Sequence, residues 1–165
     1  MDTIRIGNTS SVAKKRRINT SAGCFLVRKS DNGINEFLII HKKWADGKEE
    51  YSLPKGHKEK DETLEEAAIR ETMEESGFKN VKLLNYIGSR TYEIDWDEIQ
   101  VKTDHYFLAK LENEERLEII PEDYEPGVSV ETIWIDLDKG FDLLTNENHP
   151  EFLNLVKEFL KSTAL

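Results

Sequence analysis

Cysteine is nearly absent from this sequence, and long apolar runs are missing. Cys24 is the only cysteine among the 165 residues, which excludes an internal disulfide bond and a zinc site built from thiolates. No apolar run approaches the ~20 residues of a membrane-spanning helix, and the N-terminus has no signal-peptide core. We therefore expect a cytoplasmic protein without a membrane partner.

Positive charge is in deficit, because 23 lysines and arginines oppose 33 aspartates and glutamates. The formal net charge of −10 disfavours general binding to nucleic-acid backbones, so we expect no stable nucleic-acid partner. A small polyanionic molecule remains compatible with this charge, since bound metal ions can invert the local field. The composition specifies no oligomeric state.

The length suits one domain that buries roughly two-thirds of the surface of its unfolded chain. Residues 1–20 are polar and contain four adjacent cations, Lys14 to Arg17. Such a run can contact a phosphate or RNA, but it is more typical of a solvated arm. We expect a polar basic arm over residues 1–20 and a single domain over residues 21–165.

Carboxylates are concentrated in residues 56–78, and their spacing is regular. Thr63 and Glu66 fit a capping box, in which each side chain satisfies a free backbone N–H group of the other residue. Gly77 can take the left-handed conformation that ends a helix. These signals predict a helix over residues 64–76.

Three glutamates of this helix, Glu71, Glu74 and Glu75, are spaced i, i+3 and i+4 and project from one face. Ile69 and Met73 project from the opposite face, so we expect them in the core. Like charges at this spacing repel one another, and Mg²⁺ would offset the repulsion because it selects carboxylate and carbonyl oxygens. A solvated acidic face is the alternative interpretation.

The complete spaced pattern is more specific than the charge. It runs Gly56, five residues, Glu62, seven residues, Arg70-Glu71, two residues, Glu74-Glu75, one residue, Gly77 and an apolar Phe78. This pattern resembles the signature of the Nudix hydrolase superfamily, with Thr72 where an aliphatic residue is preferred. The resemblance extends over residues 20–162 and implies an α/β fold, an α/β/α sandwich with a central mixed β-sheet.

The resemblance also implies roles within the motif. The ligands of Mg²⁺, or of Mn²⁺ in its place, would be the Gly56 carbonyl and the carboxylates of Glu71, Glu74 and Glu75. Arg70 would orient the glutamates, and Glu62 would either ligate a metal or brace Arg70.

The general base would be Glu71 or Glu75, or a carboxylate outside the motif. A common family pattern places a glutamate shortly before the tryptophan that corresponds to Trp134, but Val128 occupies that position here. Glu125 and Glu131 lie nearby in the sequence. The identity of the base therefore stays open.

Two further segments resemble one branch of the superfamily, the diadenosine tetraphosphate hydrolases. The sequence Pro-Lys-Gly-His at residues 54–57 matches the opening of their signature. Residues 102–109 resemble a strand that carries a phosphate-contacting lysine and an aromatic residue on which a base can stack, although a half-buried structural aromatic is an equal alternative. The candidate substrate-binding residues are Lys55, His57, Lys102, Tyr106, Tyr92 and Trp96.

Apolar alternation and turn signals predict the remaining elements. We expect a hairpin from residues 22–28 and 36–41, a strand over 81–87 ended by Gly88, a second hairpin from 90–94 and 99–110, a last strand beginning at 133, and a helix over 150–160. Hairpins and helices in this order favour a mixed sheet between helices.

The expected chemistry is hydrolysis of a phosphoanhydride bond in a nucleoside polyphosphate. By resemblance, the substrate would be diadenosine tetraphosphate, cleaved to AMP and ATP. The alternatives are a nucleoside triphosphate, a nucleotide sugar or capped RNA as substrate, and a binding module that keeps the fold without hydrolysis. The full set of motif carboxylates disfavours the binding module.

Overall fold

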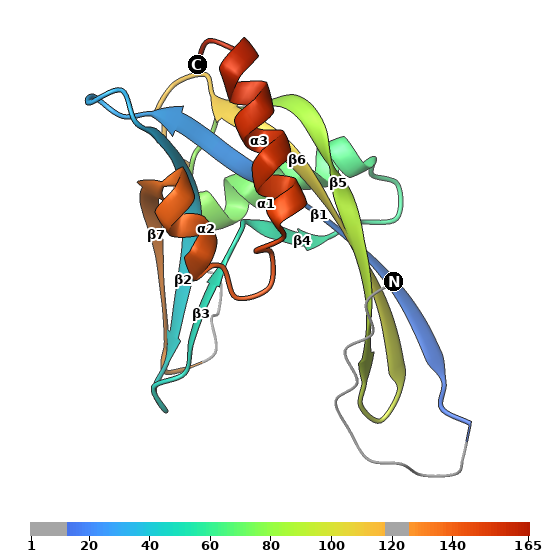
Figure 1. Ribbon diagram of the computed structural model, residues 1–165. Coiled ribbons are helices and arrows are strands. Elements are labelled where there is room, and N and C mark those ends of the chain that lie inside the picture. Colours follow the sequence, from blue (N-terminus) through green and yellow to red (C-terminus); the bar gives the residue numbers. More distant parts are fainter. Residues whose placement is uncertain (1–12, 118–125) are drawn as a thin grey trace.

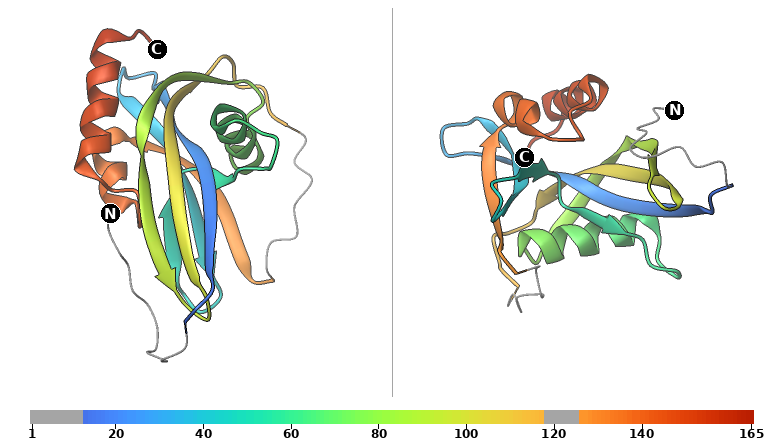
Figure 2. Two further views of the ribbon diagram at one scale, coloured as in Figure 1. Left: turned by 90° about the vertical axis from the view of Figure 1, so that its right-hand side faces the viewer. Right: turned by 90° about the horizontal axis from the view of Figure 1, so that it is seen from below.

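The computed structural model describes residues 13–117 and 126–165. A mixed β-sheet lies between helix α1 on one face and helices α2 and α3 on the other (Figures 1 and 2). In chain order the elements are β1 (Arg16–Lys29), β2 (Asn35–Trp44), β3 (Glu49–Ser52), β4 (Lys55–His57), α1 (Leu64–Ser76), β5 (Val81–Asp95), β6 (Ile99–Leu111), β7 (Val128–Asp136), α2 (Leu137–Leu143) and α3 (Pro150–Ser162). The α/β sandwich expected from the sequence is confirmed.

The sheet is mixed because its central pair of strands is parallel. Its order is β3-β2-β1-β6-β5, with β4 paired to β1 and β7 paired to β2. β1 and β6 run parallel, from Arg16 opposite Ile99 to Val27 opposite Lys110. The other pairs of described strands are antiparallel. The short strand β4 places Gly56 opposite Ala22, beside the centre of the sheet.

Three expected strand boundaries were wrong. β1 begins at Arg16, so residues 16–20 pair with β6 instead of belonging to the expected arm. Gly88 does not end a strand but lies inside the continuous strand β5, at an irregularity in its pairing with β6. Such a bulge bends a strand without ending the ladder of hydrogen bonds. The last strand also starts earlier than residue 133, at Val128.

Helix α1 forms over the residues that the sequence predicts. The Thr63 hydroxyl accepts the N–H of Glu66 at 3.1 Å, and the Glu66 carboxylate accepts the N–H of Thr63 at 2.8 Å. Gly77 has a φ of 75°, and its N–H donates to the carbonyl of Met73 at 2.9 Å. Both ends of the helix therefore satisfy backbone groups locally.

The face of α1 that packs on the sheet carries small side chains. Ala67, Ala68, Thr72 and Ser76 are the buried residues of this helix. The expectation that Ile69 and Met73 enter the core was wrong, since both are only half-buried. Small side chains let α1 lie close to β1, where the Sγ atom of Cys24 is 3.7 Å from the carbonyl of Ala68.

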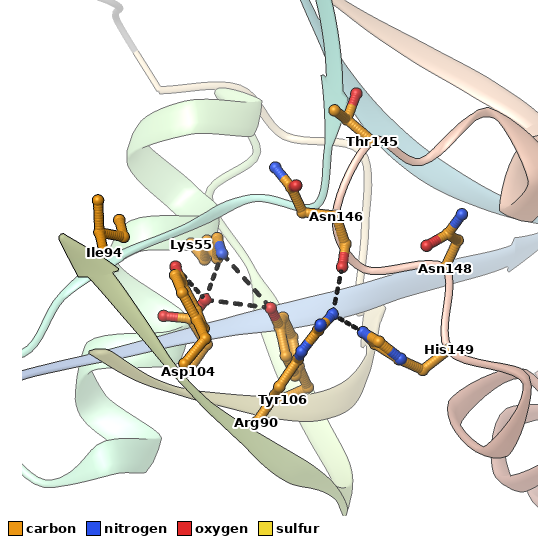
Figure 3. A pocket seen from close by; sticks show the side chains of 10 residues that line it. Lys55, Arg90, Ile94, Asp104, Tyr106, Thr145, Asn146, Asn148 and His149 are labelled. Atoms are coloured by element: carbon orange, nitrogen blue, oxygen red, sulfur yellow. Dashed lines mark hydrogen bonds and ion pairs between the residues drawn. The ribbon is translucent and has the colours of Figure 1, made fainter. Parts of the chain in front are cut away.

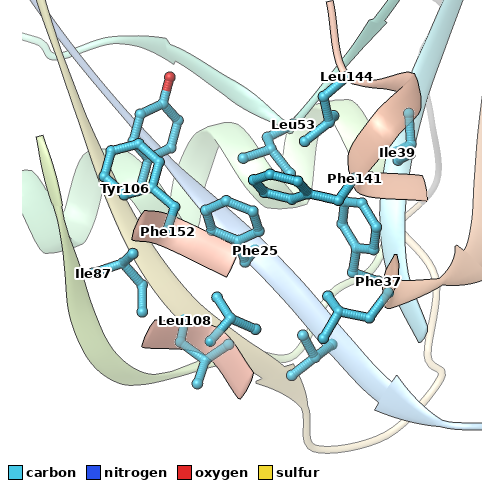
Figure 4. Close-up of a cluster of buried hydrophobic side chains, with 13 residues drawn as sticks. Phe25, Phe37, Ile39, Leu53, Ile87, Tyr106, Leu108, Phe141, Leu144 and Phe152 are labelled. Carbon is cyan, nitrogen blue, oxygen red and sulfur yellow. The ribbon is translucent and has the colours of Figure 1, made fainter. Parts of the chain in front are cut away.

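A larger apolar cluster fills the opposite face of the sheet, under α2 and α3 (Figure 4). Phe25 is fully buried at its centre and contacts the rings of Phe37, Tyr106, Phe141 and Phe152. This packing fixes β6 and the loop between α2 and α3 relative to each other. No helix in the described parts of the chain is both long and apolar enough to cross a bilayer.

Candidate active site

Arg70 organises the acidic face of α1. Its Nε and Nη2 atoms donate to the two carboxylate oxygens of Glu62 at 2.7 and 3.0 Å. Its Nη1 atom donates to Glu71 at 2.7 Å and to Glu74 at 3.3 Å, and Nη2 also donates to the carbonyl of His57 at 3.0 Å. Hydrogen bonds from Arg70 are the largest cause that lowers the pKa of Glu62 to about 2. Arg70 thus ties the helix to β4 and to the loop before the helix.

Gly56 lies directly against the carboxylate of Glu71. A Cβ atom at this position would be 2.2 Å from both Cδ and Oε2 of Glu71. Any side chain here would collide with the carboxylate, so only glycine permits this approach. The main chain of β4 and the acidic helix therefore form one surface.

Glu75 contacts the residue that precedes Gly56. Its Oε2 atom accepts the backbone N–H of Lys55 at 3.1 Å. Burial raises the pKa of Glu75 to about 7, and the nearby charge of Glu71 acts in the same direction, while Lys42 and the Lys55 N–H oppose the shift. A bound cation beside Glu71 and Glu75 would relieve the repulsion between their carboxylates.

The donors around Gly56 are chemically suited to Mg²⁺. Glu71 lies against Gly56 and Glu75 accepts the N–H of Lys55, so both offer hard oxygen ligands beside this main chain. Within residues 13–117 and 126–165, no three acidic, histidine or cysteine side chains gather as a metal-binding group. Arg70 forms ion pairs with Glu71 and Glu74. Mg²⁺ commonly takes one or two protein carboxylates and completes its octahedron with water and substrate phosphates.

A pocket of about 420 Å³ lies on the other side of β4 (Figure 3). Strands β5 and β6 and the loop between α2 and α3 line it, through residues that include Lys55, Arg90, Tyr92, Asp104, Tyr106 and His149. This volume falls within the range of roughly 300–1,000 Å³ that is usual for small-molecule sites.

Lys55 lines this pocket and contacts two acidic side chains, of which Asp104 also lines it. Its Nζ atom lies 2.5 Å from Oδ2 of Asp104, 3.3 Å from Oε1 of Glu147 and 3.4 Å from the hydroxyl of Tyr106. Burial opposes the charge of Lys55, but Tyr106, Glu147 and Asp104 together raise its pKa above the ordinary value. Burial also raises the pKa of Glu147, whose Oε2 atom has no hydrogen-bond partner among the described residues.

The structure brings some of the predicted substrate-binding residues together and separates others. Lys55, Tyr92 and Tyr106 line the pocket. The three that do not line it are His57, Lys102 and Trp96. His57 offers its carbonyl to Arg70, Lys102 lies opposite Tyr92 in the register of β5 and β6, and Trp96 is 57% exposed in the turn that follows β5.

One of the rival general bases has a different partner. Glu131, on β7, lies 2.8 Å from Nδ1 of His41, in a surface group that also contains Glu49 and Tyr51. Glu125 lies outside the described residues.

Sequence reasoning missed Asp104, Arg90 and Glu147. Asp104 had a usable signal, because it lies two residues before Tyr106 and therefore projects from the same face of β6. Glu147 had none. It belongs to a loop, and only the packing of α2 and α3 brings it to Lys55.

Comparison with known proteins identifies the family of this chain. A family model of the NUDIX domain matches residues 17–156. The chain is 32% identical over 142 residues to an asymmetrical bis(5'-nucleosyl)-tetraphosphatase of Rattus norvegicus, with 84% of this chain and 89% of that protein covered. It is 36% identical over 89 residues to the Mus musculus protein of the same name, which covers 53% of this chain and 58% of that protein.

Solved structures share the fold. An Ap4A hydrolase of C. elegans has a TM-score of 0.57 at 25% identity, covering 90% of this chain and 100% of that chain. A binary complex of C. elegans Ap4A hydrolase has a TM-score of 0.63 at 24% identity, covering 88% and 99%. With the matched domain, the related sequence and the shared fold, the chain belongs to the Nudix hydrolase family.

Proposed function

We propose that this chain hydrolyses diadenosine tetraphosphate to AMP and ATP with the help of Mg²⁺, in the cytoplasm. The observation that carries the proposal is the position of Lys55, which joins the two parts of the site. Its main-chain N–H binds Glu75 of the acidic helix, while its side chain lines the pocket. A nucleoside in the pocket would therefore hold its phosphates beside Gly56. The related tetraphosphatases favour this substrate class.

The residues of the motif would have different roles in the reaction. Glu71, Glu74, Glu75 and the Gly56 carbonyl would hold Mg²⁺. Bound there, the ion would neutralise phosphate oxygens and lower the pKa of an attacking water. Arg70 would position Glu71 and Glu74 and would keep its own proton, because a guanidinium is not deprotonated in proteins. Either Glu71 or Glu75 would accept the proton of the water.

The pocket walls support a nucleoside as the group that binds there. Tyr92 and Tyr106 present aromatic side chains, and base stacking on such rings contributes ~1–3 kcal/mol. His57, Lys102 and Trp96 remain proposed substrate contacts outside the pocket, where the distal half of a dinucleotide would extend.

A substrate panel in ¹⁸O-labelled water tests this function. Diadenosine tetraphosphate, nucleoside triphosphates, a nucleotide sugar and capped RNA would each be incubated with Mg²⁺, with Mn²⁺ or with EDTA, and the products identified by mass spectrometry. We expect AMP and ATP from the dinucleotide, with the label in one product, and no turnover in EDTA. Preferential release of pyrophosphate from a mononucleotide would contradict the substrate, and inertness towards the whole panel would indicate a binding module.

A further inference from the structure

The ammonium group of Lys55 has more than one carboxyl group beside it. One ammonium group, that of Lys55, contacts Asp104 in the pocket lining (Figure 3) and Glu147, which lies behind the lining. Both acidic side chains are almost completely buried, at 4% and 1% exposure. With both ionised the three groups sum to −1, and with one protonated they sum to zero. A phosphate group would thus meet no net positive charge at Lys55, and the other cation of the lining, Arg90, lies against Asn146 and His149.

Asp104 keeps one carboxylate oxygen for a ligand. The donors that contact it, Lys55, Tyr92 and Tyr106, all bind Oδ2, at 2.5, 3.2 and 3.4 Å. Asp104 nevertheless lines the pocket, so Oδ1 is the oxygen available to a bound molecule. An ionised carboxylate only accepts hydrogen bonds, and bonds to charged groups are the stronger ones. This part of the pocket is therefore built to recognise a hydrogen-bond donor.

The same contacts indicate that Lys55 has a structural role, whereas the sequence resemblance implied that it binds substrate. Its ammonium already has three oxygen partners in the described structure, and all three belong to the pocket wall or to the loop behind it. Moving Nζ to a phosphate would leave Asp104 and Glu147 buried beside each other without their cation, which is costly. Lys55 fixes the position of Asp104.

On the basis of the function proposed above, we infer that Asp104 accepts a hydrogen bond from the nucleoside of the substrate. Lys55 acts as a positioning residue for Asp104 and does not contact phosphate. The two donors that a nucleoside offers are the ribose hydroxyls and the exocyclic amino group of adenine. Either would direct the phosphates away from Asp104 and towards Gly56, where the acidic helix begins its contact with β4.

Ligand binding by the unmodified protein tests this inference without catalysis. Binding would be followed by NMR chemical shifts in EDTA, with adenosine, purine riboside, 2',3'-dideoxyadenosine and inorganic tripolyphosphate as probes. We expect adenosine to bind, and one of the two analogues that lack a donor to bind about tenfold more weakly, as expected for one hydrogen bond to a charged group. The analogue affected identifies the donor. If both analogues bind like adenosine, if adenosine does not bind, or if tripolyphosphate displaces it, the inference is wrong.

Two variants locate the effect. Asp104→Asn keeps the shape of the side chain and removes its charge, so it should weaken adenosine binding about tenfold but leave the donor-lacking analogue unaffected. Asp142→Asn, an exposed aspartate on α2, is the matched control. Lys55→Met should lower the affinities for adenosine and AMP by the same factor, because Lys55 acts through Asp104. A greater loss for AMP would show that Lys55 contacts phosphate.

The result separates this inference from the function on which it rests. If the protein hydrolyses the dinucleotide but Asp104→Asn binds adenosine as tightly as the unmodified protein, the inference is refuted and the proposed function stands. Adenosine binding that depends on Asp104, without hydrolysis of any substrate in the panel, would refute the proposed function and retain the nucleoside site. Should Lys55→Met fail to fold, as its NMR spectrum would show, the comparison of ligands on the unmodified protein still decides.

Discussion

The backbone N–H of Lys55 donates a hydrogen bond of 3.1 Å to the carboxylate of Glu75. Because the side chain of Lys55 leaves β4 on the other side, this single residue connects the acidic helix with the pocket. A change in the acidic helix should therefore affect the pocket, and a change in the pocket should affect the helix.

Glu75→Gln should reduce Mg²⁺-dependent turnover by about 100-fold, because it removes one anionic metal ligand and leaves the shape of the side chain. Steady-state kinetics across a range of Mg²⁺ concentrations would measure this. Glu65→Gln, an exposed residue in the first turn of the same helix, serves as the control and should behave like the unmodified protein. Full turnover by Glu75→Gln would refute the proposed metal site.

Gly56→Ala should cost about 100-fold in turnover, because its methyl group would meet the Glu71 carboxylate at 2.2–2.5 Å and displace it. Circular dichroism should show the helical content unchanged, since α1 carries its own caps. Gly33→Asn, in a turn with open space around the position, is the matched glycine substitution and should leave turnover intact. An active Gly56→Ala variant would mean that the approach of Glu71 to β4 has no role in the reaction.

The ion pair between Glu62 and Arg70 should make stability depend on pH. In the folded protein the pKa of Glu62 is lowered from 4.5 to about 2. The stability that the ionised Glu62 contributes is therefore fully present above pH 4.5, and it is lost as the pH falls from there through the folded-state pKa of about 2. We expect Glu62→Gln to be less stable than the unmodified protein at pH 7, and the difference to shrink as the pH falls from 5 to 3. Urea unfolding in EDTA would measure both proteins, and a difference independent of pH would exclude this pair as its source.

Phe25→Ala should lower the free energy of unfolding by about 3–5 kcal/mol, the usual cost of removing a fully buried aromatic side chain. Its ring contacts four other rings of the cluster in Figure 4, and α2 and α3 cannot move far enough to fill the space. Leu155→Ala on the exposed side of α3 should change stability by only about 0.5 kcal/mol. Urea unfolding of both variants checks the contrast, and equal costs would argue against this core.

Helix α1 could be predicted from the sequence because its determinants are local. The capping residues Thr63 and Glu66 and the terminal Gly77 lie within a turn of the ends that they define. The wrong prediction was which side chains face inwards. Ile69 and Met73 are the large apolar residues, but the close approach of α1 to β1 leaves room only for Ala67, Ala68 and similar small side chains.

The pairing of the strands could not be predicted in the same way. Hairpin signals identify neighbours along the chain, such as β1 with β2 and β5 with β6, and both pairs are present. The parallel pairing of β1 with β6 joins segments far apart in the sequence and has no local signal. For the same reason Glu147 escaped notice, since its contact with Lys55 exists only after α2 and α3 have packed.

The parallel pairing at the centre of the sheet also sets when this protein can fold during its synthesis. As the nascent chain leaves the ribosome, β1 carries a row of apolar side chains from Ala22 to Val27, but its partner β6 is not complete until Leu111 has emerged. Pairings between distant segments form slowly and leave such strands exposed in the meantime. The acidic motif of residues 56–78 is therefore translated before the parallel pair of strands against which its helix packs can form.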